Sequence, residues 1–322
     1  MKSTPQAARK LLHLFASGLI IAVVAGSLIY LRAVFNQEVS QRRSVMNEAV
    51  FNAQDFFVSR QTLLKSLVLA AVPDKPGHAP FISVDPEEET SISLGSENDR
   101  WNLWLTQRMV EHLSESKVSL LYVSQAQDPE VVRLFNTTSH LRPVPKEILQ
   151  RLEDEASKWY SLRDDLWLTD KKALDSPFYL FARLDNRNLA SGWLGIEVEG
   201  ADLIDALSSE SAGDFMLLDG NGQIIFTNAV QSTLVDSLHT LAPKNSFGFI
   251  GRGWLPDSLA IRKKLGYSNW QIVYAVDIRT LLPVLMWPLL GCVFLLIASC
   301  IGLRLLIARI DKRLITPGEK RI

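Results

Sequence analysis

The sequence predicts an α+β protein in which two transmembrane helices flank an external domain. That domain is expected to consist of one long helix followed by two mixed α/β sheet units. Three observations lead to this prediction. Long apolar runs lie at residues 11–31 and 281–307, a helical pattern without glycine or proline covers 33–72, and two groups of short apolar segments lie between 118 and 276.

Each apolar run is long enough to cross the hydrocarbon core of a bilayer, which is about 30 Å thick and needs about 20 helical residues. Neither run has a charge in its central part, and Arg304 lies near the exit of the second, where its side chain can reach the interface. An alternative for the first run is a cleavable signal peptide. Because the apolar core of such a peptide usually has about 7–15 residues, the length of this run favours an uncleaved anchor.

Basic residues indicate how the chain is oriented in the membrane. The tail before residue 11 carries a formal charge of +3, and the tail from residue 304 onward carries +4. Since the whole chain is −1, the segment between the tails carries −8. Lysine and arginine are enriched at the cytoplasmic ends of membrane helices, so we expect both termini in the cytoplasm and the central domain outside.

The external domain is expected to begin with a long helix at 32–72, which Pro73 ends. Within this helix, six apolar residues alternate in steps of three and four, with Arg60 at the one interrupted position. They are Met46, Val50, Ala53, Phe57, Leu64 and Leu67. Such a seam is typical of a helix that packs along another element. Two interpretations remain open: the seam packs only on its own domain, or it also contacts a parallel partner subunit at a different height of the helix.

After a polar, proline-containing loop at 73–100, the sequence predicts a first sheet unit that is complete by residue 207. We expect helices at 101–116, 145–163 and 201–207. Short apolar runs bounded by turn residues predict strands at 118–124, 166–169, 178–183 and 193–198. Helices and strands in this mixture are expected to form one sheet with helices packed on it.

A second, smaller unit follows immediately. Residues 214–228 read DFMLLDGNGQIIFTN, in which an Asp-Gly-Asn-Gly turn separates two apolar runs. Asp-Gly and Asn-Gly tolerate the positive φ angles of tight hairpins, so we expect two strands joined by a turn at 219–222. Three further strands are expected at 247–250, 258–263 and 270–276.

Few residues in the sequence could carry chemistry. The only two cysteines, Cys292 and Cys300, lie in the second apolar run, so the external domain is expected to fold without disulfides. The five histidines are not paired at helical spacing, and we expect no metal site and no cofactor. Basic residues gather at the membrane boundaries, and therefore no nucleic-acid binding is expected.

Five stretches give the chain a resemblance to a known family. In order they are DDLWLTDKKALDSPFYLFARL, SGWLGIEVEGADLIDAL, DFMLLDGNGQIIFTN, the segment from NSFGFIGRGW to NWQIVYAVDIRTLL, and DKRLITPGEKRI. Together they resemble the input region of membrane-bound sensor histidine kinases with a double-Cache (PAS-like) external domain. The likeness is greatest to the hybrid sensor kinases of the Rcs phosphorelay, and it extends from about residue 164 to the end of the sequence.

The resemblance implies a bacterial inner-membrane protein whose central domain is periplasmic. Its parts would be a cytoplasmic tail at 1–10, transmembrane helices at 11–31 and 281–307, the long helix at 32–72, a membrane-distal unit at 73–207, a membrane-proximal unit at 208–280 and a cytoplasmic stub at 308–322. In the family, kinase domains follow such a stub. Here the given sequence ends at Ile322, and none of its histidines has the context of a phosphorylated histidine, so we expect no autophosphorylation by this chain.

The resemblance also implies a ligand site on the first sheet, beneath the helix that precedes its central strands. The residues at these places are Trp159, Tyr160, Tyr122, Tyr179 and Arg183. An aromatic wall with one cation would suit a small anionic or zwitterionic molecule. In the alternative interpretation the aromatic residues belong to the core, Arg183 is a surface cation, and the signal is an envelope protein partner.

These expectations favour a sensor module as the function. The external domain would detect an envelope signal and pass it through the second membrane helix to a cytoplasmic histidine-kinase output of a two-component phosphorelay. One alternative is a truncated, non-kinase regulator that dimerises with or modulates a sensor kinase. The other is an external hydrolase anchored at both ends, which would stay active as an isolated domain.

The predicted orientation can be tested with reporter fusions. Alkaline phosphatase, which is active only outside the cytoplasm, should be active when fused after residue 150 and inactive when fused after residue 315. The measurement is phosphatase activity normalised to the level of each fusion protein. The reverse pattern would contradict the orientation, and with it an external sensor domain.

Overall fold

The computed structural model describes residues 5–76, 89–96, 99–125, 129–137, 142–157, 165–170, 177–185, 191–207, 213–228, 247–251, 256–266, 268–310 and 312. It confirms the predicted fold class, because one long helix is followed by two α+β sheet units and two helices are candidate membrane spans. The chain divides into two compact units. One contains Met1–Ser44, Leu255–Asp257 and Asp277–Ile322, and the other contains Val45–Trp254 and Ser258–Val276.

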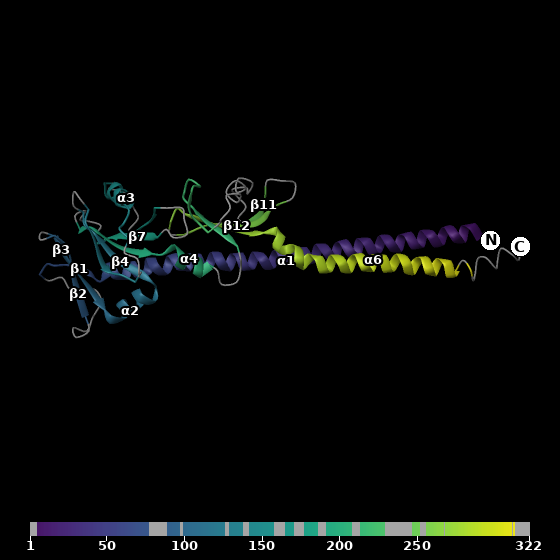
Figure 1. Cartoon of the computed structure of the whole chain (residues 1–322), viewed down its shortest axis with the longest axis horizontal. Coiled ribbons are helices and arrows are strands. Elements are labelled where there is room, and N and C mark those ends of the chain that lie inside the picture. The colour runs from purple at the N-terminus through teal and green to yellow at the C-terminus, as the bar shows by residue number, and fades with distance from the viewer. Residues whose placement is uncertain are drawn as a thin grey trace. The chain divides into compact units, whose positions relative to one another are not determined.

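The first unit contains the two candidate membrane helices. The N-terminal part of α1 (Pro5–Leu69) carries the first apolar run, and α6 (Leu282–Ile310) carries the second (Figure 1). A short 3-10 helix, η3 (Ile278–Leu281), precedes α6. Almost none of the residues in the most apolar window of either helix is buried. The core helix of a soluble protein would bury such side chains, whereas a helix in lipid leaves them exposed on the protein's own surface.

In the second unit, five strands form a first sheet. They are β4 (Val118–Val123), β5 (Val131–Phe135), β6 (Asp165–Thr169), β7 (Phe178–Arg183) and β8 (Trp193–Val198). Their order is β5-β4-β8-β7-β6, and all four pairs are antiparallel. α3 (Lys146–Ser157) lies between β5 and β6 in the chain, and α4 (Gly200–Leu207) follows β8. The four strands predicted for the first sheet are confirmed, and β5 is an additional strand at its edge.

A second five-stranded sheet repeats this topology. Its strands are β9 (Asp214–Leu218), β10 (Ile224–Thr227), β11 (Phe247–Ile250), β12 (Ser258–Lys264) and β13 (Gln271–Asp277). The order is β10-β9-β13-β12-β11. When the five strands of each sheet are numbered 1 to 5 along the chain, both sheets have the spatial order 2-1-5-4-3. The last strand of each sheet in the chain therefore lies at the centre of that sheet.

The hairpin predicted at 219–222 is confirmed. The Asp219 carboxylate accepts hydrogen bonds from the backbone N–H groups of Asn221 and Gln223, at 2.9 and 2.8 Å. Gly222 has a φ of +82°, a value that residues with a Cβ rarely adopt. Asp219 and Gly222 thus supply the side-chain acceptor and the backbone conformation that let β9 and β10 pair.

The helix predicted at 101–116 is wrong in its first half. Residues Asp99–Thr106 form strand β3, and the helix α2 covers only Gln107–Glu115. Trp101, Leu103 and Leu105 are buried while their neighbours are not, which is the two-residue period of a strand. The helix begins at Gln107 because the Thr106 hydroxyl accepts a hydrogen bond from the Met109 N–H and caps it.

β3 is the central strand of a small three-stranded sheet that the sequence did not predict. Its partners are β1 (Ala71–Pro73) and β2 (Glu89–Ser96), in the order β1-β3-β2. α1 therefore ends at Leu69, and the chain continues as the short edge strand β1. Pro73 is the last residue of this edge strand, where the missing N–H costs no pairing.

Candidate functional site

Strand register assigns the side chains of the first sheet to two faces. Residues paired directly across antiparallel strands point to the same face, and successive residues of a strand alternate. Tyr179 pairs with Glu197, and Arg183 pairs with Trp193. Because Tyr179 and Trp193 pack with residues of α3, this is the face that α3 covers. Tyr122 pairs with Leu194, one residue beyond Trp193, and therefore lies on the opposite face.

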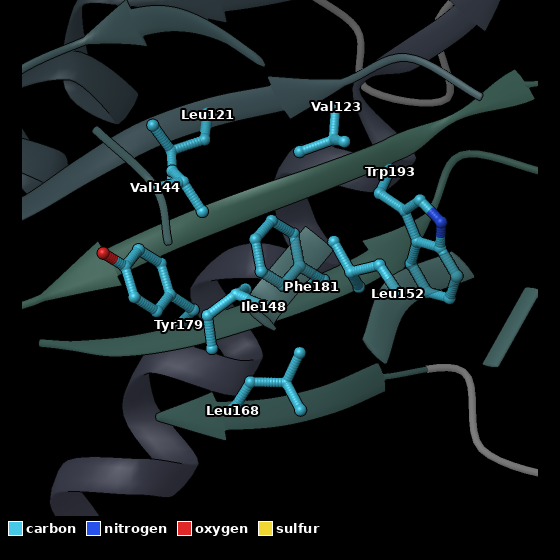
Figure 2. Packing of buried hydrophobic residues seen from close by; sticks show 9 residues of the cluster. All are labelled: Leu121, Val123, Val144, Ile148, Leu152, Leu168, Tyr179, Phe181 and Trp193. Carbon is cyan, nitrogen blue, oxygen red and sulfur yellow. The ribbon is translucent and has the colours of Figure 1, made fainter. Parts of the chain in front are cut away.

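The face beneath α3 is filled by side chains of the chain itself. Ile148 and Leu152 of α3 pack on residues from four strands in one buried cluster (Figure 2). The strand residues and the preceding loop contribute Leu121, Val123, Val144, Leu168, Tyr179, Phe181 and Trp193. A cavity of about 20 Å³ remains beside Leu152 and Trp193, which is space for about one water molecule.

The three predicted ligand residues that the structure describes do not all lie together. Tyr179 belongs to the packed cluster, and Arg183 lies over the Trp193 ring, with 4.9 Å between the guanidinium carbon and the ring centroid. Tyr122, on the other face, is buried and donates a hydrogen bond from its hydroxyl to the Ser191 carbonyl at 3.4 Å. Burial raises the pKa of Tyr122, and the nearby Asp99 carboxylate adds to this rise.

Trp159 and Tyr160 lie outside the described residues. Of the described three, only Tyr179 and Arg183 share a face, so no aromatic wall that includes Tyr122 forms around the Arg183 cation. Gly192 explains how closely Tyr122 packs. A Cβ at this glycine would lie 2.7 Å from the Tyr122 hydroxyl, and its φ is +78°.

A buried ion pair lies on the α3 face of the first sheet, and the sequence analysis missed it. Glu197 of β8 is 1% exposed, and its carboxylate lies 2.7 Å from an Arg133 guanidinium nitrogen of β5. Arg133 also donates a hydrogen bond to the Arg142 carbonyl. Burial raises the pKa of Glu197, and Arg133 partly opposes this rise. In the sequence, this pair could have been found from Glu197, an acidic residue inside an otherwise apolar predicted strand.

The opposite face of the first sheet meets α1 and the second sheet through aromatic rings. Phe57 of α1 packs edge-on against Trp167 of β6, Phe178 of β7 and Trp270, which precedes β13, with centroid distances of 5.0, 5.8 and 5.9 Å. Phe178 also contacts Phe226 of β10 at 4.9 Å. We call these five residues the aromatic junction. Each such ring pair contributes roughly 0.5–1.5 kcal/mol beyond the area it buries.

Polar contacts hold α1 to the same face. The Gln61 side chain donates a hydrogen bond to the Asp165 carboxylate, and the Lys65 ammonium lies 3.6 Å from that carboxylate. Asp165 is the first residue of β6, two residues before Trp167 on the same face. The helix is thus fixed to β6 by an apolar contact and a polar one.

The six seam residues of α1 are buried by this chain alone. Met46, Val50, Ala53, Phe57, Leu64 and Leu67 are each at most 4% exposed. Of the two interpretations of the seam, the structure therefore describes the one in which it packs on the domain itself. A homodimer contact would need other residues, because side chains already buried have no surface left for a partner.

Among the described residues, no cluster of three or more histidine, cysteine or acidic side chains is arranged to hold a metal ion. The described part of the chain contains a group of buried aromatic rings and the buried pair Arg133–Glu197.

No family model matches the chain, and no curated protein matches it. Among solved structures, it is similar to the ligand-binding domain of the Pseudomonas fluorescens chemoreceptor CtaA in complex with L-isoleucine. That alignment has 12% identity and a TM-score of 0.47, and covers 79% of this chain and 98% of the other.

Two further structures are similar at the same level. The ligand-binding domain of the Pseudomonas aeruginosa PAO1 amino acid chemoreceptor PctC in complex with GABA has 12% identity and a TM-score of 0.46, covering 74% of this chain and 100% of the other. The ligand-binding domain of the Campylobacter jejuni chemoreceptor Tlp3 in complex with L-valine has 11% identity and a TM-score of 0.42, covering 77% and 95%. Because these TM-scores are below 0.5, neither the ligands nor the binding residues of these structures are assigned to this chain.

The raised pKa of Glu197 predicts a specific pH dependence of stability. A carboxyl group whose pKa is higher in the folded state favours folding when protonated, and this contribution is lost as pH rises through the folded value. The stability of the wild type relative to Glu197→Gln should therefore fall as pH increases from the ordinary glutamate pKa toward neutrality. Thermal melting of the detergent-solubilised chain across this range measures the difference.

The control for loss of a carboxylate is Glu147→Gln, at an exposed position of α3. A difference between wild type and Glu197→Gln that stays constant or grows with pH would contradict the assignment. At each pH, the melting temperature of Glu197→Gln is subtracted from that of the wild type. This difference removes the contribution of the other carboxylates, because both proteins contain them.

Proposed function

We propose that this chain is the membrane-anchored sensory input module of a signal-transduction protein. The observation that carries the proposal is the continuity between each candidate membrane helix and an element at the centre of the external domain. α1 runs without a break from the first apolar run to Phe57 and on to Leu69. The same helix therefore contains a candidate span and one side of the aromatic junction.

The second candidate membrane helix, α6, is also connected directly to the domain, through β13. β13 is the central strand of the second sheet, and η3 and α6 follow it without an intervening loop. Asp277 caps η3 by accepting a hydrogen bond from the Arg279 N–H at 2.8 Å, and the Thr280 hydroxyl donates to the Asp277 carbonyl at 2.7 Å.

A sensor needs a route by which two states of the external domain become two states of a cytoplasmic output. Elements that pass from the domain core into a membrane helix provide such a route, since a shift of a packed strand or helix moves whatever continues from it. In this proposal both termini lie in the cytoplasm of a bacterial cell, and residues 32–280 form the periplasmic part. The charge distribution of the tails supports this orientation.

The proposed output is a histidine kinase of a two-component phosphorelay. Support comes from the five stretches of sequence that resemble double-Cache sensor kinases, and most closely the Rcs hybrid kinases. Two successive units behind one long helix are the architecture that this resemblance implies. A homodimer belongs to the same proposal, with contacts on surfaces other than the buried seam.

A chimera tests the proposed function. Residues 1–312 are joined to the kinase domains of a sensor whose response regulator drives a reporter gene. The intact chimera and one that lacks residues 45–276 should differ in output by about tenfold, within the usual range of coupling between sites. Insertion of two glycines between Asp277 and Ile278 should move the output to that of the truncated chimera, because it breaks the connection to α6.

The matched control is the same insertion between Lys75 and Pro76, two exposed residues that follow β1, which should preserve the output of the intact chimera. Reporter activity is measured at equal protein levels. Equal output from all four chimeras would show that the external domain does not control the kinase, and the sensor proposal would be abandoned.

A further inference from the structure

A second feature of the aromatic junction is a crevice beside it. A cavity of about 320 Å³ lies where α1, β6 and the turn between β12 and β13 meet. We call it the junction crevice. Its described lining residues from α1 are Phe51, Gln54, Asp55, Phe57 and Val58, joined by Trp167, Leu265, Gly266 and Ser268. This volume is within the range of small-molecule sites, about 300–1,000 Å³.

The junction crevice is distinct from the ligand site that the sequence implied. Trp167 is one residue from Leu168, which packs beneath α3, so its ring lies on the other face of the first sheet. The crevice is thus on the α1 side of this sheet, whereas Tyr179 and Arg183 are on the α3 side.

The walls of the crevice are aromatic, and one of the rings is unusually placed. Phe57 and Trp167 are buried, but Phe51 is 65% exposed and lies on α1 less than two turns before Phe57. A large apolar side chain left in water at the mouth of a cavity gains free energy when a bound molecule covers it. Aromatic faces also attract cations, because the ring quadrupole is negative above the plane.

The charge of the crevice has one sign. Asp55 is the only ionisable residue among its described lining residues, and its exposed carboxylate forms no hydrogen bond or ion pair with the described part of the chain. A carboxylate next to aromatic rings favours a cationic ligand and repels an anionic one. The nearest basic side chain in the sequence of the same helix, Arg60, stacks on Phe56 and donates to the Ser116 carbonyl. Asp55 interacts with Arg60 electrostatically but forms no ion-pair contact with it among the described residues.

One polar side chain of the crevice can orient a ligand. Trp167 contributes a ring to the wall, and its indole Nε1 is buried rather than exposed to the crevice. The Gln54 amide nitrogen donates to the Lys264 carbonyl at 3.4 Å, which leaves its oxygen as an acceptor.

We propose that the junction crevice binds a small organic cation, an alkylammonium group that carries one hydroxyl group and is about the size of choline. The ammonium group lies between Phe51 and Phe57 with Asp55 as its counter-charge, and the hydroxyl group donates to the Gln54 side-chain oxygen. Since Phe57 and Trp167 both belong to the aromatic junction, an occupant of the crevice contacts the residues that join α1 to both sheets.

Binding is tested on the full chain in maltoside micelles, which contain no choline. Titration with choline chloride should produce a saturable calorimetric signal and a change in tryptophan fluorescence. The neutral carbon analogue 3,3-dimethylbutan-1-ol has nearly the same shape without the charge, and should bind at least about tenfold more weakly because it loses the cation–π and carboxylate attraction. Absence of a choline signal, or equal binding of the neutral analogue, would overturn the proposal.

Matched variants locate the site. Asp55→Asn and Phe51→Ala each change an exposed residue of α1, and both should weaken choline binding about tenfold or more with melting curves close to wild type. Glu48→Gln removes an exposed carboxylate from the same helix outside the crevice, and should leave the affinity unchanged. Choline binding that survives both crevice substitutions, or is lost equally in Glu48→Gln, would overturn the assignment to this site.

The same cation could be free or part of a lipid headgroup. Titrations in nanodiscs of phosphatidylcholine and of phosphatidylglycerol distinguish these sources. Weaker apparent binding of added choline in the phosphatidylcholine discs would assign the crevice to a headgroup, and equal binding in both would assign it to the free cation. The binding test is independent of the sensor proposal, because it measures association alone.

Discussion

The packing of Phe57 between the two sheets is the contact on which the rest of the two-sheet domain depends. Its ring packs against Trp167 of β6, Phe178 of β7 and Trp270, which precedes β13. α1 contacts the first sheet through Phe57, Gln61 and Lys65, and the second through Phe57 and Gln54. The loss of a buried phenylalanine ring typically costs about 3–5 kcal/mol, which is a large part of the stability of a domain.

The two sheets have the same strand order, and this order determines which strands lie near the Phe57 contact. In each sheet the last strand is central, so β8 and β13 are the strands most enclosed by their neighbours. β13 continues into η3 and α6, while β8 continues into α4. A change at the junction thus acts on a central strand that leads directly to a candidate membrane helix. In the proposed sensor, this continuity is the route from the external domain to the output.

The outline of the fold could be predicted because its strongest signals are local. Apolar runs, the seam of α1 and the Asp219–Gly222 turn each depend on a few neighbouring residues. The helix predicted at 101–116 failed because tertiary pairing of β3 with β1 and β2 competes with a short helical pattern there. The alternation of Trp101, Leu103 and Leu105 could have revealed this strand.

The site was harder to predict, for a physical reason. β4 and β8 are buried along their whole length, so their sequences lack the alternation that shows which face a side chain occupies. Tyr122 and Tyr179 could not be assigned to opposite faces without the register of the sheet. The junction crevice is built from segments more than 90 residues apart, around positions 51–58, 167 and 265–268, and no local pattern joins them.

Hydrogen–deuterium exchange on the full chain tests the role of Phe57 most directly. Phe57→Leu keeps an apolar side chain and removes the ring. It should lower amide protection in both β7 and β13, whereas Leu152→Ala, on the α3 face, should lower it in β7 and leave β13 unchanged. Loss of protection confined to one sheet in Phe57→Leu would contradict the account, because the two sheets would then be stabilised independently of this contact.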